Sequence, residues 1–208
     1  MSNSKYEITD ITHKTYPFLH RIRALRDIGD QAKAGDLGGF VESESNLAVD
    51  PDDAAWIFND TIVCGSAYVD QGSTLLDNAI ACDSAYVSSG SVLSGQARAE
   101  DDAYLRGAVM NGSAQVSGFA QIISVPGQFG TPLLSGHCQV YGIVRGDVRV
   151  TGTAVILSGE EVLNDTKDTF VLTGTGRSVI RGRNRESLVP NLTPPTQEKK
   201  PKKRGMER

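Results

Sequence analysis

The chain has 208 residues, with 22 glycines, 6% aromatic residues and a formal net charge of −4. This composition is typical of a turn-rich β domain, and the absence of any apolar run near 20 residues argues against a membrane-spanning helix. The first ten residues lack the apolar core of a secretory signal, and three cysteines are too few for a disulfide framework, so we expect a cytoplasmic protein with reduced thiols.

The first 40 residues do not follow the pattern of the rest of the chain. The segment FLHRIRAL, residues 18–25, alternates apolar and polar side chains and predicts a strand. The segment AGDLGGF, residues 34–40, predicts a turn. We predict that residues 1–40 form a small β cap, because the open end of a repeat array exposes unpaired strand edges.

A six-residue period organises residues 41–185. An aliphatic residue or alanine recurs every six positions, and a small residue follows each of the first eight four positions later. A short extended segment places the aliphatic side chain inward, and the small residue fits inside the next tight corner. The inward positions include Val63, Val69, Leu75, Val87, Leu93 and Leu105, which we predict to be almost fully buried.

Three such segments make a triangular coil of 18 residues, which explains why SAYV occurs at residues 66–69 and again at 84–87. Successive coils stack about 4.8 Å apart through backbone hydrogen bonds. The outward positions then form three columns: Trp56, Thr74 and Val92; Ile62, Ile80 and Arg98; and Tyr68, Tyr86 and Tyr104. The fold class predicted is therefore all-β, a three-sided parallel β-helix.

Three features interrupt the period. One residue is missing near Gly107, and the segment Ile123–His137 is rich in Pro and Gly and reads as a loop insertion. Residues 168–182 predict a last strand pair. Residues 186–208 have no hydrophobic periodicity and predict a disordered basic tail, which could bind nucleic acid or only aid solubility. Its basic residues are Lys199, Lys200, Lys202, Lys203 and Arg204.

The repeat resembles the left-handed parallel β-helix of the hexapeptide-repeat superfamily, over roughly residues 41–156. The leader LHRIRALRDIGDQAKAGDLGGFVESESNL, residues 19–47, resembles that of bacterial and prophage-encoded β-helix proteins, some of them labelled acyltransferases from their fold. The resemblance implies a left-handed solenoid in a bacterial host cell. It also makes acyl-CoA a candidate substrate, although fold alone does not define function.

Candidate chemistry in the chain is sparse. Enzymes of that superfamily use a histidine as general base near a projecting loop, and His137 is the only histidine beside the predicted insertion. His13 and His20 fall in the cap. Cys64 and Cys82 stack one coil apart, but no histidine accompanies them and zinc takes four ligands, so we predict no metal and no cofactor. An enzyme is therefore the less favoured reading.

The most distinctive outward feature is the column Tyr68, Tyr86 and Tyr104. Stacked tyrosines stabilise neighbouring strands, but tyrosine is also enriched in interfaces. Together with Ile62 and Ile80 on the adjacent wall, the column predicts a protein-binding surface, and a homotrimer or another homo-oligomer is one use of it. Asp77, Asp83, Glu100, Asp101 and Asp102 project from corners, where they serve as turn residues or imitate the charge of nucleic acid.

From these observations we predict a non-enzymatic, protein-binding β-helix that is encoded by a phage or prophage and acts on a host protein, for example as an inhibitor of a bacterial defence complex. The main alternative is a hexapeptide-repeat acyltransferase that uses acyl-CoA and His137. An acidic DNA mimic is the third hypothesis. No membrane partner is expected.

Overall fold

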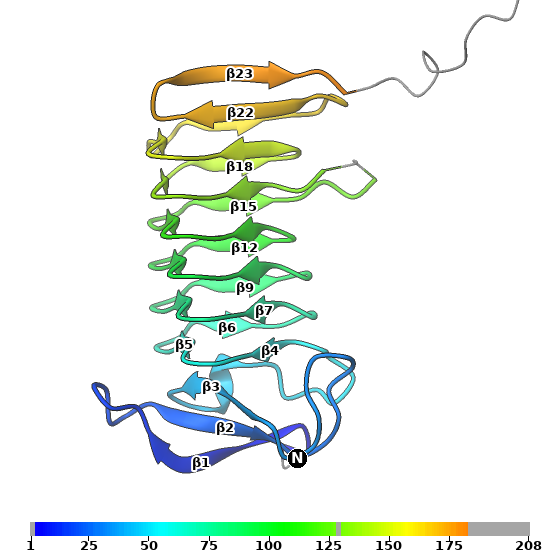
Figure 1. The fold of residues 1–208 in the computed structure, drawn as a ribbon, viewed down its shortest axis with the longest axis vertical. Helices are drawn as coiled ribbons and strands as arrows, with labels where there is room; N and C mark the ends of the chain where they lie inside the picture. Colours follow the sequence, from blue (N-terminus) through cyan, green and yellow to red (C-terminus); the bar gives the residue numbers. More distant parts are fainter. Residues whose placement is uncertain (1–2, 128–129, 183–208) are drawn as a thin grey trace, which may run out of the picture.

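The computed structural model describes residues 3–127 and 130–182 and shows an all-β chain wound into a left-handed parallel β-helix of about seven turns. Figure 1 shows the coils stacked along one axis, with an antiparallel hairpin at each end. The tail predicted for residues 186–208 lies outside the described residues. Among the described residues, no helix is long and apolar enough to cross a membrane.

Each coil contributes one short strand to each of three walls, which we number in chain order. Wall 1 is an eight-stranded sheet. It contains β4 (Trp56–Ile57), β7 (Thr74–Leu75), β10 (Val92–Leu93), β13 (Val109–Met110), β16 (Leu133–Leu134), β19 (Val148–Val150), β22 (Thr169–Thr173) and β23 (Gly176–Ile180). The strands β22 and β23 pair antiparallel, which confirms the predicted last strand pair.

Wall 2 is nine-stranded and wall 3 is six-stranded. Wall 2 contains β1 (Tyr6–Thr12), β2 (His20–Ala24), β3 (Leu37–Val41), β5 (Ile62–Val63), β8 (Ile80–Ala81), β11 (Arg98–Ala99), β14 (Gln115–Val116), β17 (Gln139–Val140) and β20 (Val155–Ile156). Wall 3 contains β6 (Tyr68–Val69), β9 (Tyr86–Ser88), β12 (Tyr104–Arg106), β15 (Gln121–Ile123), β18 (Ile143–Arg145) and β21 (Glu161–Leu163).

The core confirms the predicted register. The six inward residues Val63, Val69, Leu75, Val87, Leu93 and Leu105 are all 0% exposed. Tyr68 pairs with Tyr86 and Tyr86 with Tyr104, in steps of 18 residues, whereas the next pair, Tyr104 and Gln121, is 17 apart. The residue predicted to be missing near Gly107 is therefore absent from that coil. One central column of apolar side chains holds the walls together.

The N-terminal hairpin closes the first coil, as the cap hypothesis predicts. β1 and β2 pair antiparallel, and β3 joins them to β5 in parallel. The predicted turn over residues 34–40 is wrong at its end, because Leu37–Phe40 belongs to β3. A Cβ atom on Gly39 would lie 2.3 Å from Thr61 Oγ1, so the glycine is needed for β3 to approach the coil this closely.

Trp56 is another correction, because the period places it among the outward residues of wall 1. The structure instead buries it completely, under the cap, with its ring 6.4 Å from the ring of Tyr6 in an edge-on arrangement. The indole Nε1 has no hydrogen-bond partner. The cap therefore extends the hydrophobic core past the end of the repeats, which the periodicity alone does not reveal.

The predicted insertion at Ile123–His137 is shorter than expected. β16 lies inside that range and pairs in parallel with β13 and β19, so residues 133–137 belong to the coil. The segment that leaves the solenoid runs between β15 and β16, at the corner between wall 3 and wall 1, and projects sideways in Figure 1. Residues 128 and 129 of this segment lie outside the described residues.

A buried lysine in the cap makes stability depend on pH. Lys5 is 0% exposed, and its Nζ donates a 3.0 Å hydrogen bond to the Ala48 carbonyl. Burial lowers the pKa of Lys5 from 10.5 to about 8, although the nearby carboxylates of Asp53 and Asp50 act in the opposite direction. Between these two pKa values the unfolded chain binds more protons than the folded chain, so stability rises with pH.

We therefore expect the free energy of unfolding to increase by about 2 to 3 kcal/mol between pH 7 and pH 10, relative to a Lys5→Met variant that cannot titrate there. Urea unfolding of both proteins at a series of pH values measures the difference. Parallel pH profiles for the two proteins would show that Lys5 does not carry this pH dependence.

Candidate functional site

Three tyrosines form a continuous stack on the outside of wall 3. The rings of Tyr68 and Tyr86 are 6.0 Å apart with an interplanar angle of 24°, and those of Tyr86 and Tyr104 are 5.5 Å apart at 31°. All three side chains are half-buried. The stack arises because two consecutive 18-residue steps place the same side chain at the same point of the wall. It is a flat aromatic surface held by a rigid sheet.

The hydroxyl of the central tyrosine is fixed by an acid on its own wall. Tyr86 Oη donates a 2.8 Å hydrogen bond to Asp70 Oδ2, whereas Asp70 Oδ1 is buried without a partner. A hydrogen bond with Ser88 lowers the pKa of Tyr86, but burial and the Asp70 carboxylate outweigh it and raise this pKa overall. Burial and Asp70 also raise the pKa of Tyr68. Both hydroxyls therefore stay protonated and remain donors at neutral pH.

The same wall continues as a mixed apolar and basic surface beyond the tyrosines. In the next column, Arg106 pairs with Ile123, Ile123 with Arg145, and Arg145 with Leu163. Both arginines are exposed, and Leu163 is 46% exposed. We call the outward residues Tyr68, Tyr86, Tyr104, Arg106, Ile123, Ile143, Arg145 and Leu163 the tyrosine face. Tyrosine and arginine are the residue types most enriched where protein interfaces bind strongly.

Ile62 and Ile80 do not extend this face. Both lie on wall 2, as the period predicts, but Ile62 is only 7% exposed because it packs with Leu19 and Phe40 of the cap. Ile80 is half-buried beside the same cluster. Wall 2 is therefore partly covered by the chain itself at this end, and the available part of the predicted interface is the column of tyrosines on wall 3.

A groove of about 450 Å³ separates the cap from wall 2. Its central cation is Arg21, which pairs with Asp60 at 2.7 Å, donates to the Gly38 and Asn59 carbonyls, and lies 4.2 Å from the centre of the Phe40 ring. The imidazole of His13 approaches the same ring edge-on at 4.9 Å. Since these contacts already occupy Arg21, the groove anchors the cap and offers no free guanidinium to an anion.

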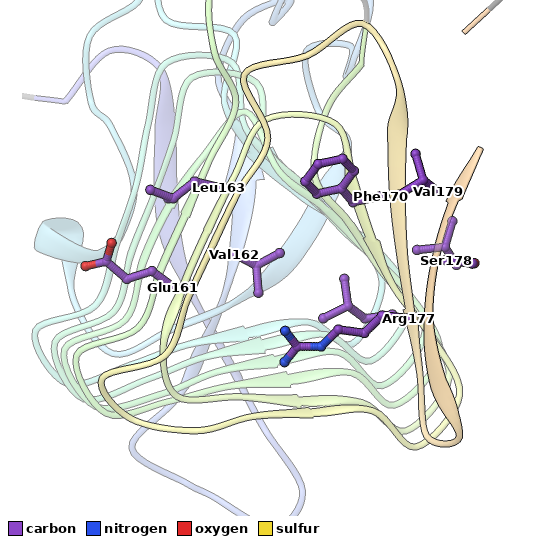
Figure 2. A pocket seen from close by; sticks show the side chains of 9 residues that line it. Glu161, Val162, Leu163, Phe170, Arg177, Ser178 and Val179 are labelled. Carbon is purple, nitrogen blue, oxygen red and sulfur yellow. The ribbon is translucent and has the colours of Figure 1, made fainter. Parts of the chain in front are cut away.

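A second cavity, of about 330 Å³, lies at the C-terminal end of the solenoid. Figure 2 looks into this end and shows Val162 and Phe170 around the hollow, with Arg177 reaching across it. Arg177 forms an ion pair with Glu160. The last strand, β23, is exposed along its length, including Val179 at 55%. Within the described residues nothing covers this apolar end.

His137 lies at a different corner from the projecting segment. Its exposed side chain belongs to the turn between β16 and β17, where its backbone N–H donates to the Gly152 carbonyl at 2.7 Å. The cavity of about 410 Å³ beside the projecting segment is lined by Val109, Gly130, Thr131, Leu133, Asp147 and Arg149, and not by a histidine. Neither His13 nor His20, both in the cap, reaches it. The geometry of the described residues gives His137 no acid partner and no pocket.

The acidic corner residues have structural roles in the described chain. Asp77 Oδ2 accepts from the Gly95 N–H at 2.9 Å, Asp83 Oδ2 from the Asp101 N–H at 3.2 Å, and Asp101 Oδ2 from the Gly118 N–H at 2.8 Å. All three have positive φ, a conformation in which aspartate is tolerated. Glu100 pairs with Arg98. Each corner carboxylate thus binds the backbone one coil ahead.

The sequence matches no protein-family model and no curated protein. The resemblance of the leader to prophage-encoded proteins, and of the repeat to acyltransferases, therefore remains a prediction. The structure adds residues that the sequence patterns did not single out, namely Asp70, Arg106, Arg145 and Leu163 on the tyrosine face. The shorter coil at Gly107 and the projecting segment shift the register, so counting in sixes does not align the later residues with the tyrosines.

Proposed function

We propose that this chain is a non-enzymatic binding protein that contacts a protein partner with its tyrosine face. The observation that carries the proposal is the stack of Tyr68, Tyr86 and Tyr104, continued by Arg106 and Arg145 on one flat wall. Rigid aromatic side chains lose little conformational entropy on binding, and tyrosine and arginine dominate the binding energy of many interfaces.

The order already present in the stack supports this use. Tyr86 is held by its neighbours on both sides and by Asp70, so a partner would not have to immobilise it. The buried Asp70 Oδ1 lacks a hydrogen-bond donor, and a donor that reached it from a partner would remove that cost. A second copy of the chain and a host protein are both candidate partners, and the leader's resemblance to prophage-encoded proteins favours the host protein.

The two alternatives gain no comparable support. An acyltransferase requires a base within reach of a bound acceptor, and the exposed His137 does not line the cavity by the projecting segment. A DNA mimic requires carboxylates free to face a partner, whereas Asp77, Asp83 and Asp101 bind backbone N–H groups. The proposal of a phage protein that inhibits a bacterial defence complex rests on the resemblance of the leader only.

The test compares Tyr86→Ala with Tyr141→Ala, which removes a half-buried tyrosine outside the stack. We expect Tyr86→Ala to weaken the interaction about 30-fold, which corresponds to about 2 kcal/mol, while Tyr141→Ala retains it. Light scattering measures self-association, and quantitative capture from bacterial lysate measures binding to a host protein.

Circular dichroism serves as the folding control, since loss of one stacked tyrosine should reduce stability by no more than about 1 kcal/mol. If Tyr86→Ala keeps the mass and the captured proteins of the wild type, the stack serves only the fold and the proposal is wrong. A fall in mass on Tyr86→Ala identifies a second copy as the partner.

A further inference from the structure

Two free thiols occupy the same position on successive coils of wall 2. Val63 pairs with Ala81, so the residues that follow them, Cys64 and Cys82, are also one coil apart. Their backbone N–H groups donate to the coil ahead, at 3.1 Å for Cys64 and 3.0 Å for Cys82. Both side chains are half-buried. The backbone therefore holds the two sulfur atoms on rigid, hydrogen-bonded strands.

The spacing of the coils decides what these thiols can do together. Equivalent atoms on adjacent coils are separated by about 4.8 Å. A disulfide requires Cβ atoms about 3.8 Å apart, so oxidation would have to pull the two coils together against their backbone hydrogen bonds. Two metal–thiolate bonds of about 2.3 Å in a straight line span about 4.6 Å, which matches the spacing. The stack suits a bridging metal ion better than a covalent bond.

The surroundings restrict the metal to one that accepts two ligands. Cys64 packs against the apolar cluster of Leu19, Phe40 and Ile62. The described residues contain no group of three or more histidine, cysteine or acidic side chains arranged to hold a metal ion. The nearest carboxylates are engaged, since Glu42 Oε2 accepts from the Gly65 N–H at 2.8 Å and Asp83 Oδ2 from the Asp101 N–H at 3.2 Å. Zinc, which takes four ligands, is thereby disfavoured.

We propose that Cys64 and Cys82 together bind one soft monovalent ion of the copper(I) class, as two thiolates in a linear arrangement. Thiolates are the ligands that select copper(I). Binding releases the two thiol protons to solvent and creates two metal–sulfur bonds, with no change in oxidation state. The ion connects the first two coils across wall 2, beside the cap. This inference does not depend on the tyrosine face, which lies on wall 3.

Copper(I) itself is the probe, added anaerobically to the full chain in competition with a coloured copper(I) chelator. We expect one ion per chain and a thiolate-to-copper absorption band in the ultraviolet. Cys64→Ser and Cys82→Ser should each weaken binding by more than about 100-fold, since losing a ligand costs more than losing a residue that only supports one. Cys138→Ser is the matched control, because Cys138 is a buried thiol in another coil.

Three outcomes would overturn the proposal: wild-type protein that binds no tighter than Cys64→Ser, a loss of binding in Cys138→Ser with its fold intact, or a stoichiometry other than one. Circular dichroism of the variants separates misfolding from ligand loss. Oxidised glutathione provides a second test. An intramolecular disulfide between Cys64 and Cys82 that forms readily, in a protein that does not retain copper(I), would show that the thiols form a redox pair instead.

Discussion

Val87→Asp should unfold the solenoid. Val87 is completely buried and pairs with Val69 on the preceding coil and Leu105 on the next, so the new carboxylate would have no water and no partner. Burying an uncompensated charge in an apolar core costs more than the whole stability margin of many domains, and we expect a loss of at least about 4 kcal/mol. The measurement is urea unfolding followed by circular dichroism, with the soluble yield recorded alongside.

The matched control is Gln139→Asp, which introduces the same carboxylate at an exposed outward position of wall 2. It should change stability by less than about 0.5 kcal/mol, because its side chain remains in water. The comparison isolates burial from charge. A Val87→Asp protein that is soluble and melts like the wild type would contradict the inward assignment of this position.

Gly39→Ala is expected to separate the cap from the first coil. The added methyl group would lie 2.3 Å from Thr61 Oγ1 and 2.8 Å from the Thr61 carbonyl oxygen, which accepts the Phe40 N–H at 2.8 Å. Backbone atoms cannot move aside as a flexible side chain can, so β3 has to shift away from β5. We expect a loss of about 3 kcal/mol, at the upper end of the usual cost of overpacking.

The chain offers a direct readout of this change. Trp56 is the only tryptophan and is buried beneath the cap, so displacement of the cap should shift its fluorescence to longer wavelength. Gly176→Ala is the control, because a Cβ atom there meets nothing within 4 Å and the residue has no positive φ. If Gly39→Ala keeps both the wild-type emission and the wild-type stability, the close packing of β3 does not hold the cap.

Physical arguments explain why the middle of the fold could be predicted from sequence. Each coil repeats the same environment, so a residue such as Leu75 or Leu93 meets the same requirement for an inward apolar side chain, and the pattern records it many times. The tyrosine stack follows from the same rule, because side chains 18 residues apart share one point of a wall. The strand pair at residues 168–182 was also predictable, from local alternation and a glycine turn.

The candidate sites needed the tertiary structure wherever the period breaks. Counting in sixes does not place Arg106 or Arg145 beside the tyrosines, since a 17-residue coil and the projecting segment intervene. It places His137 near an insertion, whereas β16 separates the two. Asp77 is a typical corner residue by sequence, but only the coordinates show its carboxylate on the Gly95 N–H of the next coil.

The sequence by itself determined the β-helix, its inward residues and the column of tyrosines, because these depend on a local rule repeated in every coil. The tertiary structure alone decided that Trp56 is buried, that Leu37–Phe40 is a strand and that Ile62 is covered by Leu19 and Phe40. Those features arise from contacts between the cap and the first coil, which occur once in the chain. A contact made only once leaves no periodic signal, and its geometry is set by how the two surfaces pack.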